Sequence, residues 1–547
     1  MNHSPDGQQP TRASDWRLSA MLFVVAGAGL VLFLVRLLTV WPATVDDAFI
    51  TFRYASNLAH FGAPVWNLGE PRPTEGYTSF LWMVLMAIPH LFHFGAVVFS
   101  KVVGVACTFA TILVSARLAW ELCSSADPFI RRLTAVLVVP ILVASPATAV
   151  HAVSGMETAL FTFLATALLL TAILLLRTRA SSPPSWRRVN LFFVLGLLLA
   201  LTRPEGVVMV LATAATLVLS RHASVLPPAP SHRRRLLLRG LCLFVLPAAA
   251  FLLWRISYYH HLFPLSFYVK VAAPSTRWHF DGARELLRFL RELFVAQPLF
   301  GLSLVLGAVK VWRTATPALV AVLAHVLFFA VPKPIMAFEW RFLFPALPFF
   351  AGLSAVGLGT LVEWLSDRIR SRTASALAFR RAAVAFGIAM AAVMLQISAC
   401  SSGSTRRLAD FAAYGRAMRS AHIALGKALR RLGGEDPGRH SLATGEAGAI
   451  PYYSGWRTVD IFGLNDVQIA TSHNRDMRLV LAGDPEIVVL VSISATKFAG
   501  FTAWEGELYE LCSAAGYQRL DTLRFDARSL RMWLWVLGRP GAKPILG

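Results

Sequence analysis

The chain has 547 residues, of which 56% are hydrophobic and only 15% are charged, and its formal net charge is +22. Because soluble domains carry about a quarter charged residues, this composition excludes a soluble globular protein and indicates a polytopic membrane protein. The arginines lie in blocks between apolar runs, as the positive-inside rule expects of cytoplasmic loops. The positive charge therefore indicates contact with the lipid bilayer and no nucleic acid partner.

The first elements follow from a change of polar to apolar sequence. Residues 1–17 are polar and are expected to form a cytoplasmic tail. The apolar run Leu18–Val40 is long enough for a first span, and within it Arg36 is expected to snorkel outward. The first external loop, residues 41–98, is therefore predicted on the outer face.

This first external loop begins with two adjacent carboxylates, Asp46 and Asp47. Carboxylates at the mouth of an apolar span are costly, so water, a cation or a substrate proton is expected to occupy them; a solvated helix cap is the alternative. The apolar run Tyr77–His90 looks like a second span. However, an odd number of crossings must separate Asp47 from the basic pair Arg131 and Arg132, so this run is interpreted as an interfacial or re-entrant helix.

After the first loop, apolar runs alternate regularly with basic inner loops and outer turns. The later spans are predicted near Phe99–Leu118, Leu133–Val150 and Thr158–Leu176, on either side of residues 202–206, and near Leu241–Ile256, Pro298–Val311, Ala318–Ala330, Phe342–Leu361 and Ala382–Ala399. The amphipathic stretch Arg284–Phe294 is expected on the membrane surface. This gives a polytopic α-helical domain over residues 18–400 with about 11 spans, the amino terminus inside and the carboxyl terminus outside.

Residues 401–547 have the composition of an ordinary soluble protein. They are predicted to form an extracytoplasmic domain of the α/β or α+β class, a normal size for one domain. In this domain a helix-like stretch, Leu408–Leu432, precedes two strand-like stretches, Ile487–Val491 and Met532–Val536.

The predicted sidedness gathers unusual polar residues at the outer ends of the spans. They are Asp46, Asp47, Arg53, Glu75, Lys101, His151, Glu157, Arg203, Glu205, Tyr268, Lys270, Glu339 and Arg341. Anchoring alone would favour Lys and Arg at inner ends, so this mixed set indicates a site. Structural interpretations stay open: snorkelling for Lys101, a helix start for Glu157, and an interfacial aromatic belt for the neighbouring Tyr54.

Several patterned segments run through the chain. They are Asp46–Tyr54, Val65–Glu70, Glu75–Trp82, Ser154–Thr158, Thr202–Gly206, Arg341–Pro348 and, near the carboxyl end, Gly448–Gly455, Val459–Asp460 and Gly463–Asp466. In these segments the chain resembles polyprenyl-phosphate-dependent glycosyltransferases of the GT-C fold, especially terminal arabinofuranosyltransferases of the actinobacterial cell wall. The resemblance is nearly full length. It is specific for the superfamily and less so for the sugar.

The resemblance implies transfer of a sugar from a polyprenyl-phosphate donor to a hydroxyl of a cell-envelope glycan or glycoprotein. D-arabinofuranose is the first candidate for this sugar. The site would face the exterior of the cytoplasmic (inner) membrane. Asp46 or Asp47 would act as general base. Lys101, Arg203 and Arg341 would bind the donor phosphate, because arginine engages phosphate oxygens bidentately.

The remaining roles implied by the resemblance concern substrate and metal. Carboxylate oxygens suit a divalent cation, for which Asp47 is the candidate ligand, and no other cofactor is expected. The residues expected to bind substrate are Arg53, Tyr54, Glu75, His151, Glu157, Glu205, Tyr268, Lys270 and Glu339.

Other functions are compatible with the same residues. A polyprenyl-phosphate mannose-type glycosyltransferase differs only in the sugar. A transporter or flippase of lipid-linked saccharides should place its charges near the bilayer midplane and often contains internal repeats, whereas here the polar set lies on one side. A structural scaffold leaves the outer carboxylates unexplained.

Overall fold

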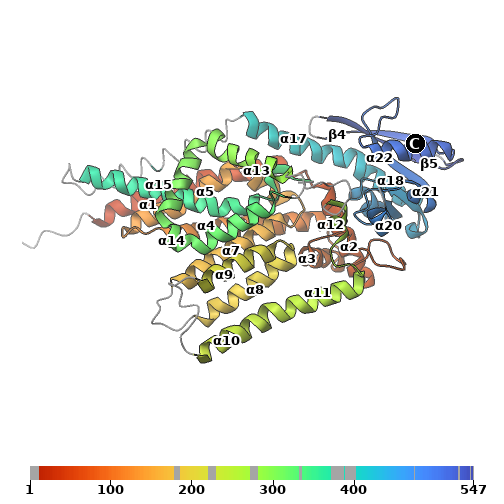
Figure 1. Cartoon of the computed structure of the whole chain (residues 1–547). Coiled ribbons are helices and arrows are strands. Elements are labelled where there is room, and N and C mark those ends of the chain that lie inside the picture. Colours follow the sequence, from red (N-terminus) through yellow and green to blue (C-terminus); the bar gives the residue numbers. More distant parts are fainter. Residues whose placement is uncertain are drawn as a thin grey trace, which may run out of the picture.

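A computed structural model of the chain describes residues 11–177, 185–219, 230–270, 281–331, 336–370, 387, 402–472, 475–527, 530–542 and 544–545. In this structure a bundle of long helices adjoins a smaller domain built on a β-sheet, formed by the carboxyl-terminal part of the chain (Figure 1). Short helices, among them α2 (Asp46–Phe61) and α12 (Leu265–Lys270), lie where the two parts meet (Figure 1).

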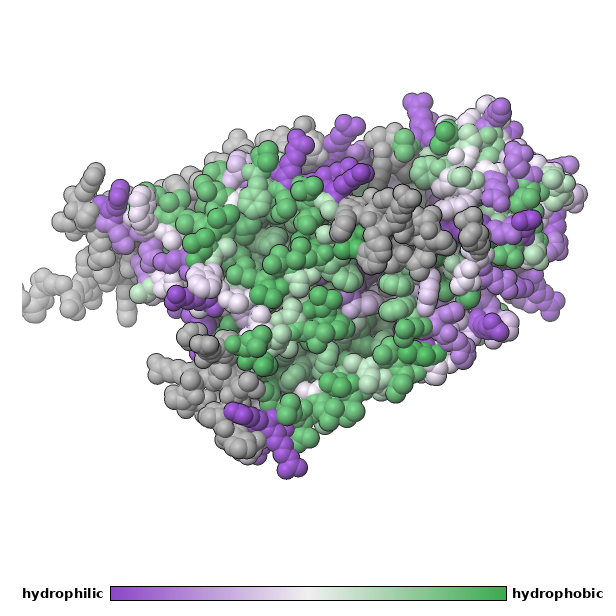
Figure 2. All heavy atoms as spheres, in the orientation of Figure 1, coloured by the Kyte–Doolittle hydropathy of each residue, from purple (hydrophilic) through white to green (hydrophobic). Residues whose placement is uncertain are grey.

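The helices of the bundle follow the apolar runs of the sequence. They are α1 (Thr11–Val40), α4 (Ala96–Leu122), α5 (Pro128–Ala144), α6 (Pro146–Val153), α7 (Thr158–Leu176), α8 (Trp186–Thr202), α9 (Gly206–Leu219), α10 (Pro230–Gly240), η1 (Leu241–Val245), α11 (Leu246–Tyr259), α14 (Pro298–Phe328) and α15 (Leu347–Arg370). Within the described residues, six helices are long and apolar enough to cross a membrane, or seven if the bent pair α5 and α6 is one span. Figure 2 shows apolar side chains over the bundle and hydrophilic ones over the sheet domain and the opposite end, as in a polytopic membrane protein.

Helices α5 and α6 form one run that is bent by 72° at its break. A break leaves the last carbonyl groups of the first helix without intrahelical partners. Arg36 supplies partners, because its Nη1 donates to the carbonyl oxygens of Val143 and Ala144, each at 2.7 Å. Arg36 is only 4% exposed, so the prediction that it snorkels outward is wrong.

Where two spans and a turn are predicted between residues 298 and 330, the structure has one continuous helix, α14, with Pro317 inside it. Both ends of α14 contact the same short segment: Phe300 lines a small cavity with Phe344, and His325 Nε2 lies 2.9 Å from the carbonyl oxygen of Phe342. A straight helix would separate residues 300 and 325 by about 37 Å, so α14 bends strongly between them.

The two spans predicted on either side of residues 202–206 are shorter than expected. Helices α8 and α9 have 17 and 14 residues. The run Tyr77–His90 contains helix α3 (Phe80–Leu91), whose 12 residues are fewer than a span needs, and its interfacial or re-entrant position stays a prediction. The span predicted at Ala382–Ala399 lies outside the described residues, apart from Gly387. The total of about 11 spans and the inside–outside orientation stay predictions.

Four further short elements connect the bundle helices. They are α13 (Asp281–Arg291), η2 (Glu292–Ala296), η3 (Phe338–Trp340) and η4 (Phe344–Ala346). The first two cover the amphipathic stretch predicted over Arg284–Phe294, which is therefore helical.

Among the described residues of the sheet domain, five strands form one sheet in the order β2-β1-β3-β5-β4. Its elements are β1 (Ser441–Thr444), β2 (Arg457–Asp460), β3 (Ile487–Ser492), β4 (Gln518–Ala527), β5 (Leu530–Gly538), α17 (Ser402–Met418), η5 (Arg419–Ile423), α18 (Ala424–Leu432), η6 (Pro437–Arg439), α19 (Ala449–Ser454), α20 (Val467–Thr471), α21 (Arg478–Ala482) and α22 (Ala503–Ala514). Strands β2, β1 and β3 are parallel, whereas β5 pairs antiparallel with both β3 and β4. Strand β3 is buried along its whole length, as expected of a central strand covered on both faces.

Both predicted strands and the predicted helix of this domain are confirmed. Strands β1 and β2 were missed because four residues carry little periodic signal, and β4 because its sequence is largely polar. The domain boundary at residue 401 stays a prediction.

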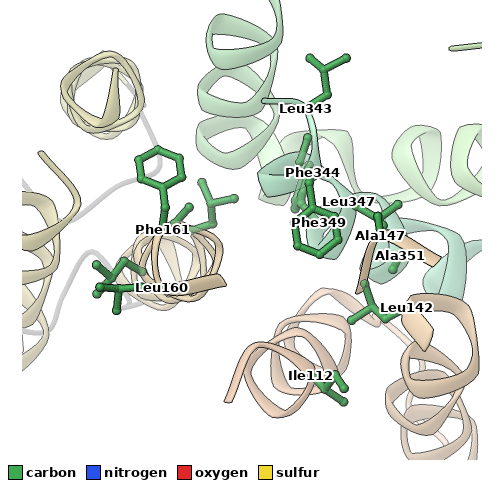
Figure 3. Packing of buried hydrophobic residues seen from close by; sticks show 14 of the residues in the cluster. Ile112, Leu142, Ala147, Leu160, Phe161, Leu343, Phe344, Leu347, Phe349 and Ala351 are labelled. Carbon is green, nitrogen blue, oxygen red and sulfur yellow. The ribbon is translucent and has the colours of Figure 1, made fainter. Parts of the chain in front are cut away.

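The core of the bundle is a cluster of buried apolar side chains drawn from many helices. Figure 3 shows part of this cluster, in which Ile112, Leu142, Phe161, Phe344 and Phe349 come from α4, α5, α7, η4 and α15. Close packing of this kind fixes the helix ends relative to one another. The residues at those ends form the site described next.

Candidate functional site

A cavity of about 440 Å³ lies where the bundle meets the sheet domain. Its lining comes from one face of α2, from the first-loop segment 76–79, from the ends of several bundle helices and from Leu464 of the sheet domain. Charged side chains and phenylalanine rings share this one cavity.

The charged part of the cavity is a set of ion pairs at helix ends. Glu157 precedes α7, Arg203 follows α8, and Arg341 follows η3. Glu157 Oε1 lies 3.2 Å from Arg203 Nη1 and 3.0 Å from Arg341 Nη2, so one carboxylate oxygen holds both guanidinium groups. Arg203 Nε lies 2.5 Å from Glu205 Oε1. Two glutamates thus balance two arginines where an unpaired charge would be costly.

The turn between α8 and α9 brings Arg203 and Glu205 to the cavity. Pro204 disfavours a helical residue before it, and Arg203 is accordingly extended, with φ −153° and ψ 137°. At Gly206 a Cβ atom would lie 2.6 Å from the carbonyl oxygen of Leu199, so only glycine fits against α8 there. The sequence Arg-Pro-Glu-Gly therefore ends one helix, begins the next and leaves both charged side chains at the bend.

Helix α2 presents two different faces. Asp47 and Thr51 line the cavity, and residues four apart share one face of a helix. The carboxylate of Asp46 instead binds the sheet domain, where it accepts hydrogen bonds from the backbone N–H groups of Gly448 (2.9 Å) and Ala449 (2.8 Å). The two adjacent aspartates therefore have different surroundings, and only Asp47 lines the cavity.

The apolar part of the cavity is a wall of phenylalanine rings. Phe263 stacks on Phe267 with ring centroids 4.4 Å apart, and Phe329 stacks on Phe342 at 5.0 Å. The guanidinium carbon of Arg203 lies 5.1 Å from the centroid of the Phe342 ring. A cavity with this lining suits a ligand that has an anionic end and an apolar body.

Arg53, predicted to bind substrate, lies outside the cavity lining and contacts the sheet domain. Its guanidinium donates to the carbonyl oxygens of Trp66 (2.8 Å), Pro451 (2.7 Å) and Trp456 (2.8 Å). It also donates to Asn67 Oδ1 at 2.9 Å. Arg53 therefore joins α2 and the first loop to the sheet domain.

Tyr54 and Glu75, also predicted to bind substrate, hold the first loop in place. The Tyr54 hydroxyl accepts a hydrogen bond from Gly76 N at 2.9 Å and lies 3.1 Å from Asn465 Oδ1. Glu75 forms an ion pair with Arg255 of α11, whose Nε lies 2.8 Å from each carboxylate oxygen. These contacts fix the segment that begins at Gly76 and lines the cavity.

Lys101, His151 and Glu339 likewise lie outside the cavity lining. Lys101 Nζ donates to the carbonyl oxygen of Trp41. His151 Nε2 lies 2.8 Å from the carbonyl oxygen of Glu339, whose carboxylate is 3.5 Å from Arg407 Nε. Two of the three predicted phosphate ligands are thus brought together, and the predicted lysine is not among them.

Tyr268 and Lys270 belong to α12. Tyr268 packs against the cavity-lining ring of Phe263, with centroids 6.5 Å apart, but does not itself line the cavity. Lys270 is the last residue of α12, and its side chain lies outside the described part of the structure. Among the described residues, no group of three or more His, Cys, Asp or Glu side chains is suited to a metal ion. A divalent cation at Asp47 stays a prediction.

Sequence reasoning missed the neutral part of the cavity. Thr51 and Ser266 line it with hydroxyl groups, and Leu464 reaches it from the sheet domain. The helical spacing from Asp47 would have indicated Thr51. No local pattern places Leu464 there, because it meets the first loop only through the tertiary fold.

Comparisons with known proteins bear on the fold. Residues 412–534 match a family described as a domain of unknown function (DUF8728). No curated protein matches the chain. Among solved structures, ArnT from Cupriavidus metallidurans in the apo state has a TM-score of 0.60 at 13% identity, covering 94% of this chain and 98% of that chain. ArnT bound to undecaprenyl phosphate has a TM-score of 0.56 at 14% identity, with the same coverage.

A third similar structure is the archaeal oligosaccharyltransferase AglB from Archaeoglobus fulgidus, in complex with an inhibitory peptide and a dolichol-phosphate. It has a TM-score of 0.52 at 13% identity and covers 88% of this chain and 70% of that chain. Identities this low establish the fold alone. The chain is a polytopic helical membrane protein that shares the fold of ArnT and AglB, which confirms the GT-C type of fold predicted from the sequence.

Proposed function

We propose that the chain is a glycosyltransferase of the cytoplasmic (inner) membrane, with the cavity and the sheet domain facing the exterior. It transfers a sugar from a polyprenyl-phosphate donor to a hydroxyl of a cell-envelope glycan or glycoprotein. The sugar that we propose is D-arabinofuranose. The observation that carries this proposal is the single cavity in which Asp47, the adjacent Arg203 and Arg341, and the phenylalanine wall meet. Similar folds bind undecaprenyl phosphate in ArnT and a dolichol-phosphate in AglB.

The two arginines are suited to the phosphate of such a donor. The nitrogens of Arg203 and Arg341 that contact Glu157 lie within about 6 Å of each other, since both contact one oxygen. Arg341 Nε is buried and has no hydrogen-bond partner among the described residues. A buried donor without a partner calls for one, and phosphate oxygens accept from guanidinium groups with good geometry. The polyprenyl chain follows the phenylalanine wall.

Asp47 is the general base of the proposed reaction. In a single displacement, the acceptor hydroxyl gives its proton to the Asp47 carboxylate while its oxygen bonds to the anomeric carbon. The bond from that carbon to the phosphate oxygen breaks, and its electron pair leaves with the polyprenyl phosphate. Arg203 and Arg341 stabilise the charge that develops on this leaving group.

The test uses membranes that contain the full-length protein, decaprenyl-phosphate [¹⁴C]arabinose and a short arabinan acceptor. The wild type should transfer the label, and Asp47→Asn should lower the rate about 10²–10⁴-fold. Asp436→Asn, the same change at an exposed position of the sheet domain, should leave the rate unchanged.

Each other result changes the proposal in a defined way. Equal rates for the wild type and Asp47→Asn would remove the assignment of the base. Transfer only from a polyprenyl-phosphate mannose donor would replace arabinose by mannose. Transfer from neither donor would contradict both sugars and favour a transporter of lipid-linked saccharide.

A further inference from the structure

The face of α2 that points away from the cavity is bound to the sheet domain along its length. Asp46, Phe49 and Arg53 recur at helical spacing and share this face. Asp46 and Arg53 bind backbone groups of the sheet domain. Between them, the Phe49 ring lies 5.6 Å, centroid to centroid, from both Tyr452 and Tyr453 of α19. The position of α2 is therefore set by the domain on its outer side as well as by the bundle.

Asp46 is held by two separate elements of the sheet domain. Its carboxylate accepts from the start of α19, and its backbone N–H donates to the hydroxyl of Tyr414 on α17 at 3.1 Å. The charged or titratable groups that influence it are Glu446, His422 and its neighbour Asp47. His422 Nε2 lies 2.8 Å from Glu446, so these two are paired with each other. Asp46 is 8% exposed and does not line the cavity.

Gly448 makes this contact possible. A Cβ atom there would lie 2.1 Å from the carbonyl oxygen of Asp46 and 2.4 Å from its carboxylate carbon. The first of these atoms belongs to the backbone of α2, so it cannot rotate away as a flexible side chain could. Any side chain at position 448 must therefore push the first turn of α2 away from the sheet domain.

We propose that Asp46 is a positioning residue and that the sheet domain, through Gly448 and Ala449, aims the Asp47 carboxylate into the cavity. The inference rests on the proposed function for the role of Asp47. Consecutive helical residues point about 100° apart, so a carboxylate fixed at position 46 orients its neighbour at position 47. The sheet domain is then a required part of the active site and not only an attached module.

A positioning role of Asp46 can be distinguished from a catalytic one by kinetics. The kcat and KM of transfer from decaprenyl-phosphate [¹⁴C]arabinose are measured over a range of pH. Asp46→Asn should lower kcat about tenfold through misplacement of the base, with the KM for the donor retained. Gly448→Ala leaves both carboxylates intact and should lower kcat by a similar factor, with the pH profile of the wild type retained. Gly506→Ala, in a helix of the same domain where a Cβ meets nothing within 4 Å, should have the wild-type rate.

Two results would overturn the proposal. One is a wild-type rate for Gly448→Ala. The other is a loss for Asp46→Asn as large as that for Asp47→Asn, since that would make Asp46 a candidate for the base.

Hydrogen exchange tests the same contact without any sugar. The amides of residues 46–54 should exchange faster in full-length Gly448→Ala than in the wild type, whereas Gly506→Ala should match the wild type. Unchanged exchange in Gly448→Ala would contradict the positioning contact whatever the substrate is. A wild type that transfers no arabinose but shows the expected exchange would contradict only the proposed function.

Discussion

The buried arginines on the two sides of α2 use their guanidinium groups in different ways. On the side of the sheet domain, Arg53 donates to three backbone carbonyl oxygens and to one amide oxygen. On the side of the cavity, Arg203 and Arg341 share the carboxylate of Glu157, and Arg341 Nε has no hydrogen-bond partner among the described residues. The first arrangement satisfies neutral groups of the protein, and the second leaves a buried N–H donor for a further acceptor.

This difference shows why burial of a charge does not by itself indicate a binding site. A cation whose donors are matched by backbone carbonyls holds parts of the chain together. A cation that lies beside a cavity and has a donor without an acceptor can still bind a ligand. The comparison can be broken by substitutions on either side of α2.

The largest effect is expected on the cavity side. Arg341→Gln should lower the rate of sugar transfer about 10²–10³-fold, because a donor to the leaving phosphate is lost. Thermal unfolding should change little, since Glu157 keeps its ion pair with Arg203. The transfer rate of Arg341→Lys should lie between those of the wild type and Arg341→Gln, because lysine keeps the charge but lacks the forked donors of a guanidinium group. A transfer rate within twofold of the wild type for Arg341→Gln would contradict a role in binding phosphate.

The same comparison explains how far the sequence predicts the site. Asp47, Arg203, Glu205 and Arg341 were indicated as charged residues at outer span ends, and the cavity brings them together with Glu157. The fold class, the longest apolar helices and the central strand could be predicted from apolar periodicity, because that pattern lies within each segment of the sequence.

The rest could not be predicted because the partners are not local. Arg53, Lys101 and His151 have the same sequence signature as the cavity residues, yet each binds backbone carbonyl oxygens. A carbonyl group leaves no mark on the residue type that carries it. Glu75 has a charged partner, Arg255, but only the tertiary fold brings the two together.

The second largest effect is expected on the side of α2 that contacts the sheet domain. Arg53→Met removes the donor for the carbonyl groups of Pro451 and Trp456, which lie in the interface. Each unsatisfied buried acceptor costs about 1–3 kcal/mol, so a loss of roughly 3 kcal/mol or more is expected, seen as a lower Tm of the purified protein. Arg478→Met, at an exposed position, is the matched control. Equal Tm values for the two variants would show that Arg53 does not hold the domains together.

A smaller effect is expected at the contact between the first loop and the sheet domain. A Cβ at Gly76 would lie 1.7 Å from Asn465 Oδ1 and 2.8 Å from the carbonyl oxygen of Leu464. Gly76→Ala should therefore destabilise the protein by about 1–3 kcal/mol through overpacking. Gly95→Ala, in the same loop where a Cβ meets nothing within 4 Å, should not lower the Tm. A Tm for Gly76→Ala as high as that control would mean that this contact yields easily.

The smallest effect is a pH dependence of the contact between the first loop and the sheet domain. Burial raises the pKa of Asp46 to about 7, that of Glu70 to about 7 and that of Asp460 to about 6. At pH 5 the folded protein keeps protons that the unfolded chain has largely lost, so the stability from these groups is complete below about pH 4 and declines as the pH rises through 6 to 7. Asp460→Asn removes one of these groups, so the Tm of this variant relative to the wild type should rise by about 2 °C between pH 5 and pH 8. A Tm difference between Asp460→Asn and the wild type that does not change with pH would mean that Asp460 is ionised in the folded protein over the whole range.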